Sequence, residues 1–188
     1  QTCALPIFRS FETLLQLSDP PTVSYDGSDT NCPDGTSTEP VSYCASTNVL
    51  GVDVDALAEL GTAEEPRRGD VIPLNVSGDY SAYVLFASRY TLAVQKEAGQ
   101  ALDNPQTALR SACLAGVITA GLSAENPEAS GLEVWLSPGD LDEAVSGLLS
   151  DGLTASDING VTLPSGFSRV DAFRSGVLGG QETCTVRY

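Results

Sequence analysis

The stretch from Asp79 to Gln100 constrains the fold most, because its apolar residues leave little polar surface on any side. Residues at helical spacings of three and four form a stripe that two leucines widen: Tyr83, Phe86, Tyr90, Ala93, Val94, Leu85 and Leu92. A helix that is apolar nearly all round is usually buried in the middle of a domain. We therefore expect a long central helix, capped by Asp79 or Ser77 and ending near Gly99.

Length, composition and charge bound the class of protein. At 188 residues, of which 41% are hydrophobic, the chain fits one globular domain with a sizeable core. Its 25 acidic and 9 basic residues give a net charge of −16, which repels phosphate backbones and anionic lipid. We therefore expect neither nucleic acid nor a membrane surface as a partner. No apolar run approaches the roughly 20 residues that span a bilayer.

Two residue types are missing from the chain. The absence of histidine excludes Ser-His-Asp and Cys-His catalytic arrangements and every metal site with a histidine ligand. There is also no methionine, and Gln1 to Ile7 match what a common sequencing-library adapter would encode. We expect residues 1–7 to be a non-native leader, with the natural protein continuing upstream, and residues 8–188 to form a single domain. The alternative is a natural loop with a chance match.

The cysteines indicate disulfides. Without Cys3, which lies in the expected leader, an even number remains: Cys32, Cys44, Cys113 and Cys184. They are scattered without any C-x-x-C pair, which suits disulfides better than a metal site. Three pairings are possible, and we expect Cys32 with Cys44 around a short turn-rich loop and Cys113 with Cys184 between two helical regions. This predicts an oxidising, extracytoplasmic location. The alternative is four buried free thiols in a cytosolic protein.

The rest of the chain predicts short strands followed by helices. Candidate strands bounded by turn residues cover 22–25, 41–44 and 49–52. Candidate helices with start or stop signals cover 8–17, 53–60, 105–122, 138–149 and 165–178, the last ended by Gly179-Gly180. We therefore expect an α+β, mostly helical domain with a short N-terminal β-hairpin.

Four segments from residue 43 onward carry a family likeness. They are Tyr43-Cys44 with Leu50-Gly51-Val52-Asp53, then Ala93-Val94-Gln95, then Leu109 to Gly116, and finally Leu136 to Ala144 with Gly166 to Phe173 and Cys184. In this order they resemble segments of the bacterial neutral zinc metallopeptidase family: the Tyr-Cys-Pro segment, the end of the HExGH zinc helix, the E-x-x-A-D-C-x-A-G helix and the closing helix pair. The resemblance implies a zincin-like metallopeptidase scaffold, in a degenerate form seen in actinobacterial envelope proteins.

The functional positions of that family fall on side chains that cannot hold zinc. The two zinc histidines correspond to Ser88 and Leu92, and the general-base glutamate between them corresponds to Arg89. The third ligand corresponds to Ala108, and the aspartate that follows it corresponds to Ala112. A hydrolytic zinc site needs three protein ligands and an open position for water. The resemblance therefore implies no catalytic residue, no metal and no cofactor.

Arg89 is unusual inside this apolar helix. We hypothesise that its guanidinium donates to a carboxylate or to backbone carbonyls and braces the former cleft without a metal. The alternative is a side chain that extends along the helix edge to solvent. The former substrate cleft, between the central helix and the hairpin, is the expected binding surface, with Arg89, Tyr83 and Tyr90 as candidate residues.

Together these inferences predict a non-catalytic pseudopeptidase that binds a protein partner, or acts as an accessory module, in the cell envelope. It would be secreted or tethered there. One alternative is an active neutral zinc metallopeptidase-type hydrolase whose ligands lie outside this fragment, which an upstream His-rich segment would favour. Another is a purely structural domain of a larger envelope protein, which would have no stable partner after mild solubilisation of envelopes.

Overall fold

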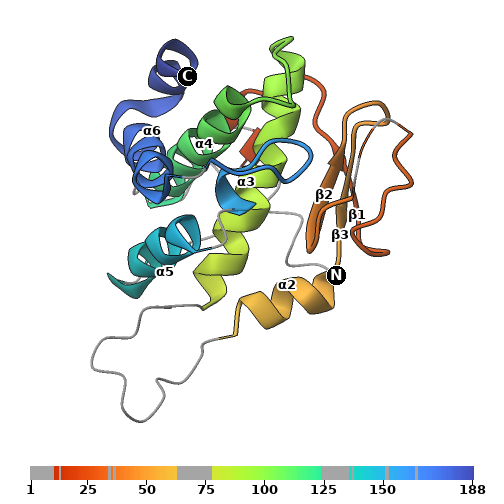
Figure 1. Cartoon of the computed structure of the whole chain (residues 1–188), viewed down its shortest axis with the longest axis horizontal. Coiled ribbons are helices and arrows are strands. Elements are labelled where there is room, and N and C mark those ends of the chain that lie inside the picture. Colours follow the sequence, from red (N-terminus) through yellow and green to blue (C-terminus); the bar gives the residue numbers. More distant parts are fainter. Residues whose placement is uncertain are drawn as a thin grey trace.

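A computed structural model describes residues 11–12, 14–33, 35, 37–62, 78–123, 136, 138–150, 153–163 and 165–188. In chain order the elements are β1 (Thr22–Ser24), β2 (Val41–Cys44), β3 (Val49–Val52), α2 (Val54–Leu60), α3 (Asp79–Glu97), α4 (Pro105–Ser123), α5 (Pro138–Leu149), the 3-10 turn η1 (Leu153–Ala155) and α6 (Gly166–Arg187). A small sheet lies at one edge of the molecule, and α3 separates it from the other long helices (Figure 1). The predicted α+β, mostly helical class is confirmed, and the expected leader lies outside the described residues.

The predicted central helix is confirmed as α3. Figure 1 shows it in the middle of the molecule, with β2 and the other strands on one side and α4 on the other. From Val84 to Ala93 every side chain of α3 is buried. Because protein covers α3 from both sides, the helix needs no polar face, which accounts for its apolar sequence.

The start of α3 is capped from a distant helix, and Asp79, one of the two predicted caps, is not the cap residue. The N-cap residue is Gly78, with Asp79 already helical, and Ser77 lies outside the described residues. The backbone amide of Tyr80 donates to Oε2 of Glu143 on α5 over 2.9 Å. The Glu143 carboxylate also lies so close to Gly78 that a side chain there would collide with it. Free amides and the helix dipole stabilise a carboxylate at this position.

The three strands form a sheet in the order β1-β3-β2. β2 and β3 make the predicted antiparallel hairpin, which pairs Val41 with Val52, and β1 adds to β3 in parallel. After β3, the Asp53 side chain accepts from the amide of Ala56 at 2.9 Å and caps α2, as the sequence predicts. Since β2 contacts α3, the hairpin fixes one side of the central helix.

Helix α6 continues past its predicted end at Gly179. The chain bends at Gly180, which has a left-handed φ of 69°, and helical structure resumes as far as Arg187. The resumed turns fold back along α6, because the Arg187 guanidinium lies 2.6 Å from the Asp171 carboxylate and also donates to the Ser175 hydroxyl. The glycine pair therefore turns the helix where we expected it to end, since long-range contacts hold the continuation.

Two glycines allow α4 and α6 to pack backbone against backbone. A side chain at Gly116 on α4 would collide with the carbonyl oxygen of Phe173, and one at Gly176 on α6 would collide with the carbonyl oxygen of Cys113. Such close approach leaves no room for any other residue at either position. This contact fixes α6 on the side of α4 that faces away from the sheet (Figure 1).

Both expected disulfides are present, Cys32 with Cys44 and Cys113 with Cys184. The alternative of four free thiols is therefore wrong. Two disulfides are compatible with an extracellular protein. None of the helices in the described part of the chain has the length and apolarity that crossing a bilayer requires.

Candidate functional site

The most distinctive polar arrangement surrounds Arg89, in the middle of α3. Its side chain is only 1% exposed. Nη1 donates to the hydroxyl of Ser156 at 2.9 Å and to the carbonyl of Asp157 at 2.7 Å. Nη2 donates to the hydroxyl of Thr38 at 3.2 Å and to the carbonyl of Ile158 at 3.0 Å. We call these five residues the Arg89 node.

The Arg89 node joins three parts of the chain that are distant in sequence. Thr38 belongs to the loop before β2, and Ser156 begins the turn after η1. The expected donation to backbone carbonyls is observed at Asp157 and Ile158. The alternative, a side chain that reaches solvent along the helix edge, is wrong because Arg89 is buried. The node can therefore brace α3 against both segments.

Burial and a nearby carboxylate set the charge of the node. Burial lowers the pKa of Arg89 to about 10, and the negative charge of Asp157 opposes this shift. At neutral pH the guanidinium is still protonated. The Asp157 carboxylate also accepts from the amides of Asn159 and Val161, both at 2.9 Å, which shapes the turn whose carbonyls face Arg89. The buried cation is thus solvated by protein carbonyls, hydroxyls and one carboxylate charge.

A second arginine, Arg169 on α6, binds both ends of the segment that connects α5 to α6. It is 5% exposed and donates to the carbonyls of Leu148, Leu149 and Leu163. A cation at the last carbonyls of α5 complements the helix dipole. In the sequence, Arg169 is only one residue of the segment from Gly166 to Phe173 that carries the family likeness. An arginine close to Phe167, Val170 and Phe173, in a chain with only 9 basic residues, was the available sign that its side chain is buried.

The other positions that the metallopeptidase resemblance assigns to the zinc site carry no metal-ligating side chain. The Ser88 hydroxyl donates to the carbonyl of Leu85 at 2.8 Å, within its own helix. Leu92, Ala108 and Ala112 are buried apolar residues of α3 and α4. The structure therefore places these side chains in the packed core between the two helices, where they contribute to stability.

The proposed cleft residues do not form an exposed wall, which corrects our expectation. Arg89 and Tyr90 are each 1% exposed. Tyr90 and Tyr83 pack edge-on against Phe11, with ring centroids 5.3 and 5.7 Å apart, so they form an aromatic cluster with the N-terminal segment. Burial raises the pKa of both tyrosines. Both rings support the core beside the Arg89 node; Tyr90 is buried, and Tyr83 is only partly exposed.

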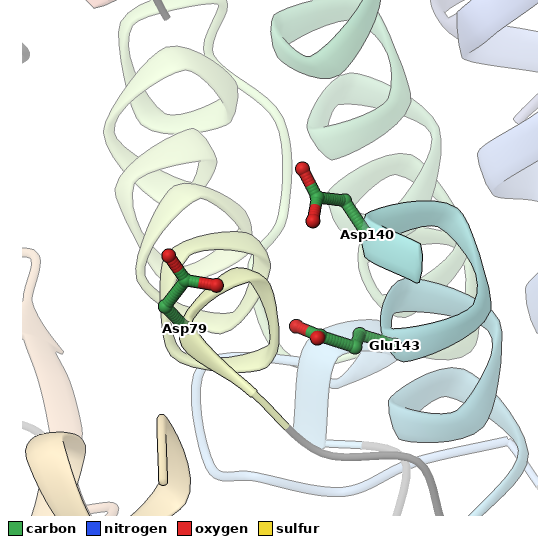
Figure 2. Close-up of side chains that lie close together, drawn as sticks. All are labelled: Asp79, Asp140 and Glu143. Atoms are coloured by element: carbon green, nitrogen blue, oxygen red, sulfur yellow. The ribbon is translucent and has the colours of Figure 1, made fainter. Parts of the chain in front are cut away.

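Three acidic side chains meet at the N-terminal ends of α3 and α5. Figure 2 shows Asp79 on one helix facing Asp140 and Glu143 on the other, and their oxygens lie within 4.8 Å of one another. Glu143 already caps α3 through the amide of Tyr80. Acidic residues are favoured in the first turn of a helix, and two such turns meet here. Helix capping therefore explains the cluster, of which the sequence singled out only Asp79, as a candidate cap.

The hydrogen bonds of the Arg89 node hold α3 to two other segments of the chain. A guanidinium has no acceptor atom, so Arg89 cannot remove a proton from a nucleophile. Comparison of the chain with protein families, curated proteins and solved structures gave no match. The likeness to metallopeptidases therefore rests on the sequence segments, and the function is inferred from the node.

Proposed function

We propose that this chain is a metal-free pseudopeptidase with a zincin-like scaffold, and that it binds a protein partner as an accessory module of the cell envelope. The Arg89 node carries the proposal. In the family that the sequence resembles, the general-base glutamate occupies the position of Arg89. A cation there cannot accept a proton and disfavours a Zn²⁺ ion beside it.

The geometry of the node supports this role for Arg89. A catalytic zinc would hold side chains of two helices together in the former active centre. Arg89 instead makes four hydrogen bonds, to the loop before β2 and to the turn after η1. The scaffold can thus stay rigid after the ligands are lost, and a rigid scaffold is what a binding module needs.

The surroundings are consistent with an extracytoplasmic binding role. The long buried helix with a small sheet on one side agrees with the scaffold that the resemblance implies. The two disulfides suit an oxidising compartment. The strongly acidic charge favours a partner whose contacting surface is basic.

The test is to purify the full-length protein from native envelopes without a chelator, after mild solubilisation. Zinc is then measured by elemental analysis, and co-purifying proteins are identified by mass spectrometry. An unrelated envelope protein with the same tag is the control. We expect less than about one tenth of an equivalent of zinc, and at least one protein absent from the control.

The outcomes separate the three readings of the chain. Stoichiometric zinc would overturn the proposal and favour an active hydrolase with ligands elsewhere in the protein. Zinc-free protein without a specific partner would contradict the accessory role and favour a purely structural domain. Zinc-free protein with a specific partner would support the proposal.

A further inference from the structure

The two disulfides differ in how far a reductant can reach them. Cys113 and Cys184 are 0% and 1% exposed, between α4 and the folded-back end of α6. In the other pair Cys44 is also buried, whereas Cys32 is partly exposed. Thiol–disulfide exchange starts with attack of a thiolate on one sulfur, so its rate depends on access. Of the four disulfide-bonded cysteines, Cys32 is the accessible target.

A hydroxyl group lies beside the accessible disulfide. Oγ of Ser46 is 3.2 Å from Sγ of Cys44 and 3.8 Å from Sγ of Cys32. Because a disulfide sulfur carries no hydrogen, Ser46 must be the donor. A hydrogen-bond donor stabilises a thiolate, and a stabilised thiolate leaves faster. Ser46 is thus closest to the sulfur that would leave after attack at Cys32.

We propose that the Cys32–Cys44 disulfide is a thiol-exchange site, opened by a dithiol while the domain stays folded and Cys113–Cys184 stays closed. A thiolate of the dithiol bonds to Sγ of Cys32, the S–S bond breaks, and its electron pair leaves on Sγ of Cys44. The second thiolate of the dithiol then attacks its own partner sulfur and releases Cys32 as a thiolate. The dithiol ends as a disulfide, the protein gains two electrons, and both cysteine thiolates take protons from water.

Opening this disulfide would loosen the Arg89 node. The Cys32–Cys44 bond closes the loop that carries Thr38. The Thr38 hydroxyl accepts a hydrogen bond from Arg89 and donates one to the carbonyl of Val41. The Thr38 methyl group also lies against Gly160, in the turn that Arg89 holds. Reduction would therefore release the Thr38 contact of the node, and the turn after η1 would lose the support of Thr38 against Gly160. This inference is independent of the proposed function, because it requires neither a partner nor the loss of zinc.

The test uses the intact protein, with Cys113–Cys184 as the internal control. Dithiothreitol is titrated at neutral pH without denaturant, free thiols are alkylated and mapped by mass spectrometry, and circular dichroism follows the fold. We expect Cys32 and Cys44 to be labelled at a reductant concentration at least about tenfold lower than Cys113 and Cys184, with the fold retained. Hydrogen exchange at residues 157–161 should become faster once this bond opens.

Two variants of the same turn sharpen the test. Ser46→Ala should slow the opening about threefold, because it removes one hydrogen bond of ordinary strength to the leaving sulfur. Thr47→Ala is the matched control and should leave the rate unchanged. Labelling of all four cysteines together, labelling of Cys113 and Cys184 first, or no labelling until the fold is lost would each overturn the proposal. Unchanged hydrogen exchange after selective opening would overturn the link to the Arg89 node.

Discussion

Nη1 of Arg89 lies 2.7 Å from the carbonyl oxygen of Asp157, 68 positions further along the chain. A cation in the middle of a buried helix thus holds a turn that no local sequence signal connects to it. The carbonyl of Ile158 and the hydroxyls of Thr38 and Ser156 are the other acceptors of its two Nη groups. Loss of the guanidinium would leave these acceptors without a donor in a region from which water is excluded.

Removal of the Arg89 side chain should destabilise the fold strongly. We expect Arg89→Ala to lower the free energy of unfolding by about 3–5 kcal/mol, as is typical when one member of a buried charged network is removed. Arg89→Lys keeps the charge but lacks the planar fork, so its loss should be smaller. Urea unfolding at neutral pH measures both values. Arg174→Ala, at an exposed arginine of α6, is the control, and an Arg89→Ala midpoint equal to that of the control would contradict a bracing role.

A methyl group at Gly176 should separate α4 from α6. Because a side chain there would collide with the carbonyl of Cys113, we expect Gly176→Ala to cost about 3 kcal/mol or more, at the upper end of overpacking effects. Gly147→Ala on α5 is the matched control, since its methyl group would meet no atom closer than 4.0 Å. That change should be neutral or stabilise by up to about 1 kcal/mol. Equal thermal midpoints for the two variants would show that the helices do not approach this closely.

Glu97 should make stability depend on pH. The Ser18 hydroxyl and the amides of Asp19 and Ser18 donate to its carboxylate and lower its pKa below the ordinary 4.5. A carboxylate whose pKa is lower in the folded state stabilises the fold at pH values above its unfolded-state pKa. This stabilisation is lost as the pH falls through the folded-state pKa. Wild type should therefore be more stable than Glu97→Gln at neutral pH, and the gap should close below about pH 4.5. Glu182→Gln is the control in urea titrations, and a gap that stays constant down to pH 3 would exclude this linkage.

Restoration of the family ligand set tests the metallopeptidase resemblance directly. The combined variant Ser88→His, Leu92→His and Ala108→Glu places three ligands on α3 and α4, and Arg89→Glu can be added to remove the cation. We expect about one equivalent of bound Zn²⁺ with Arg89→Glu and much weaker binding with Arg89 retained. Co²⁺ absorption reports tetrahedral coordination, and a variant with only the two histidines is the control. No difference in metal affinity between the three-ligand variant and this control, both folded, would exclude a zincin-like arrangement of these positions.

The elements with local signals could be predicted from the sequence. The apolar surround of α3, the hairpin of β2 and β3, and the Asp53 cap depend on spacing and on residues close in the chain. The cysteine pairs followed from the count, the short loop and the two helical regions. The donation from Arg89 to carbonyls is one of the two alternatives that the sequence left open, and the cost of an uncompensated cation in an apolar helix favours it.

The failures involve contacts between residues that are distant in sequence. Glu143 caps α3 from 63 residues away, Arg169 binds the end of α5 across 20 or more positions, and the end of α6 is held back by Asp171. No periodicity or capping rule encodes such partners. The expectation that Tyr90 lines a binding surface is wrong for a related reason, because Phe11 of the N-terminal segment packs against its ring and the position of that segment depends on tertiary packing.

The fold-back of α6 has a consequence for the covalent topology of the molecule. The bond between Cys113 and Cys184 closes a ring that contains α5, η1 and most of α6, including the turn that Arg89 holds. Cleavage of any one peptide bond within this ring would leave both products attached, so a nicked molecule would migrate as one band without reductant and as two with it. A protease in the surroundings could therefore open the backbone here without releasing a fragment.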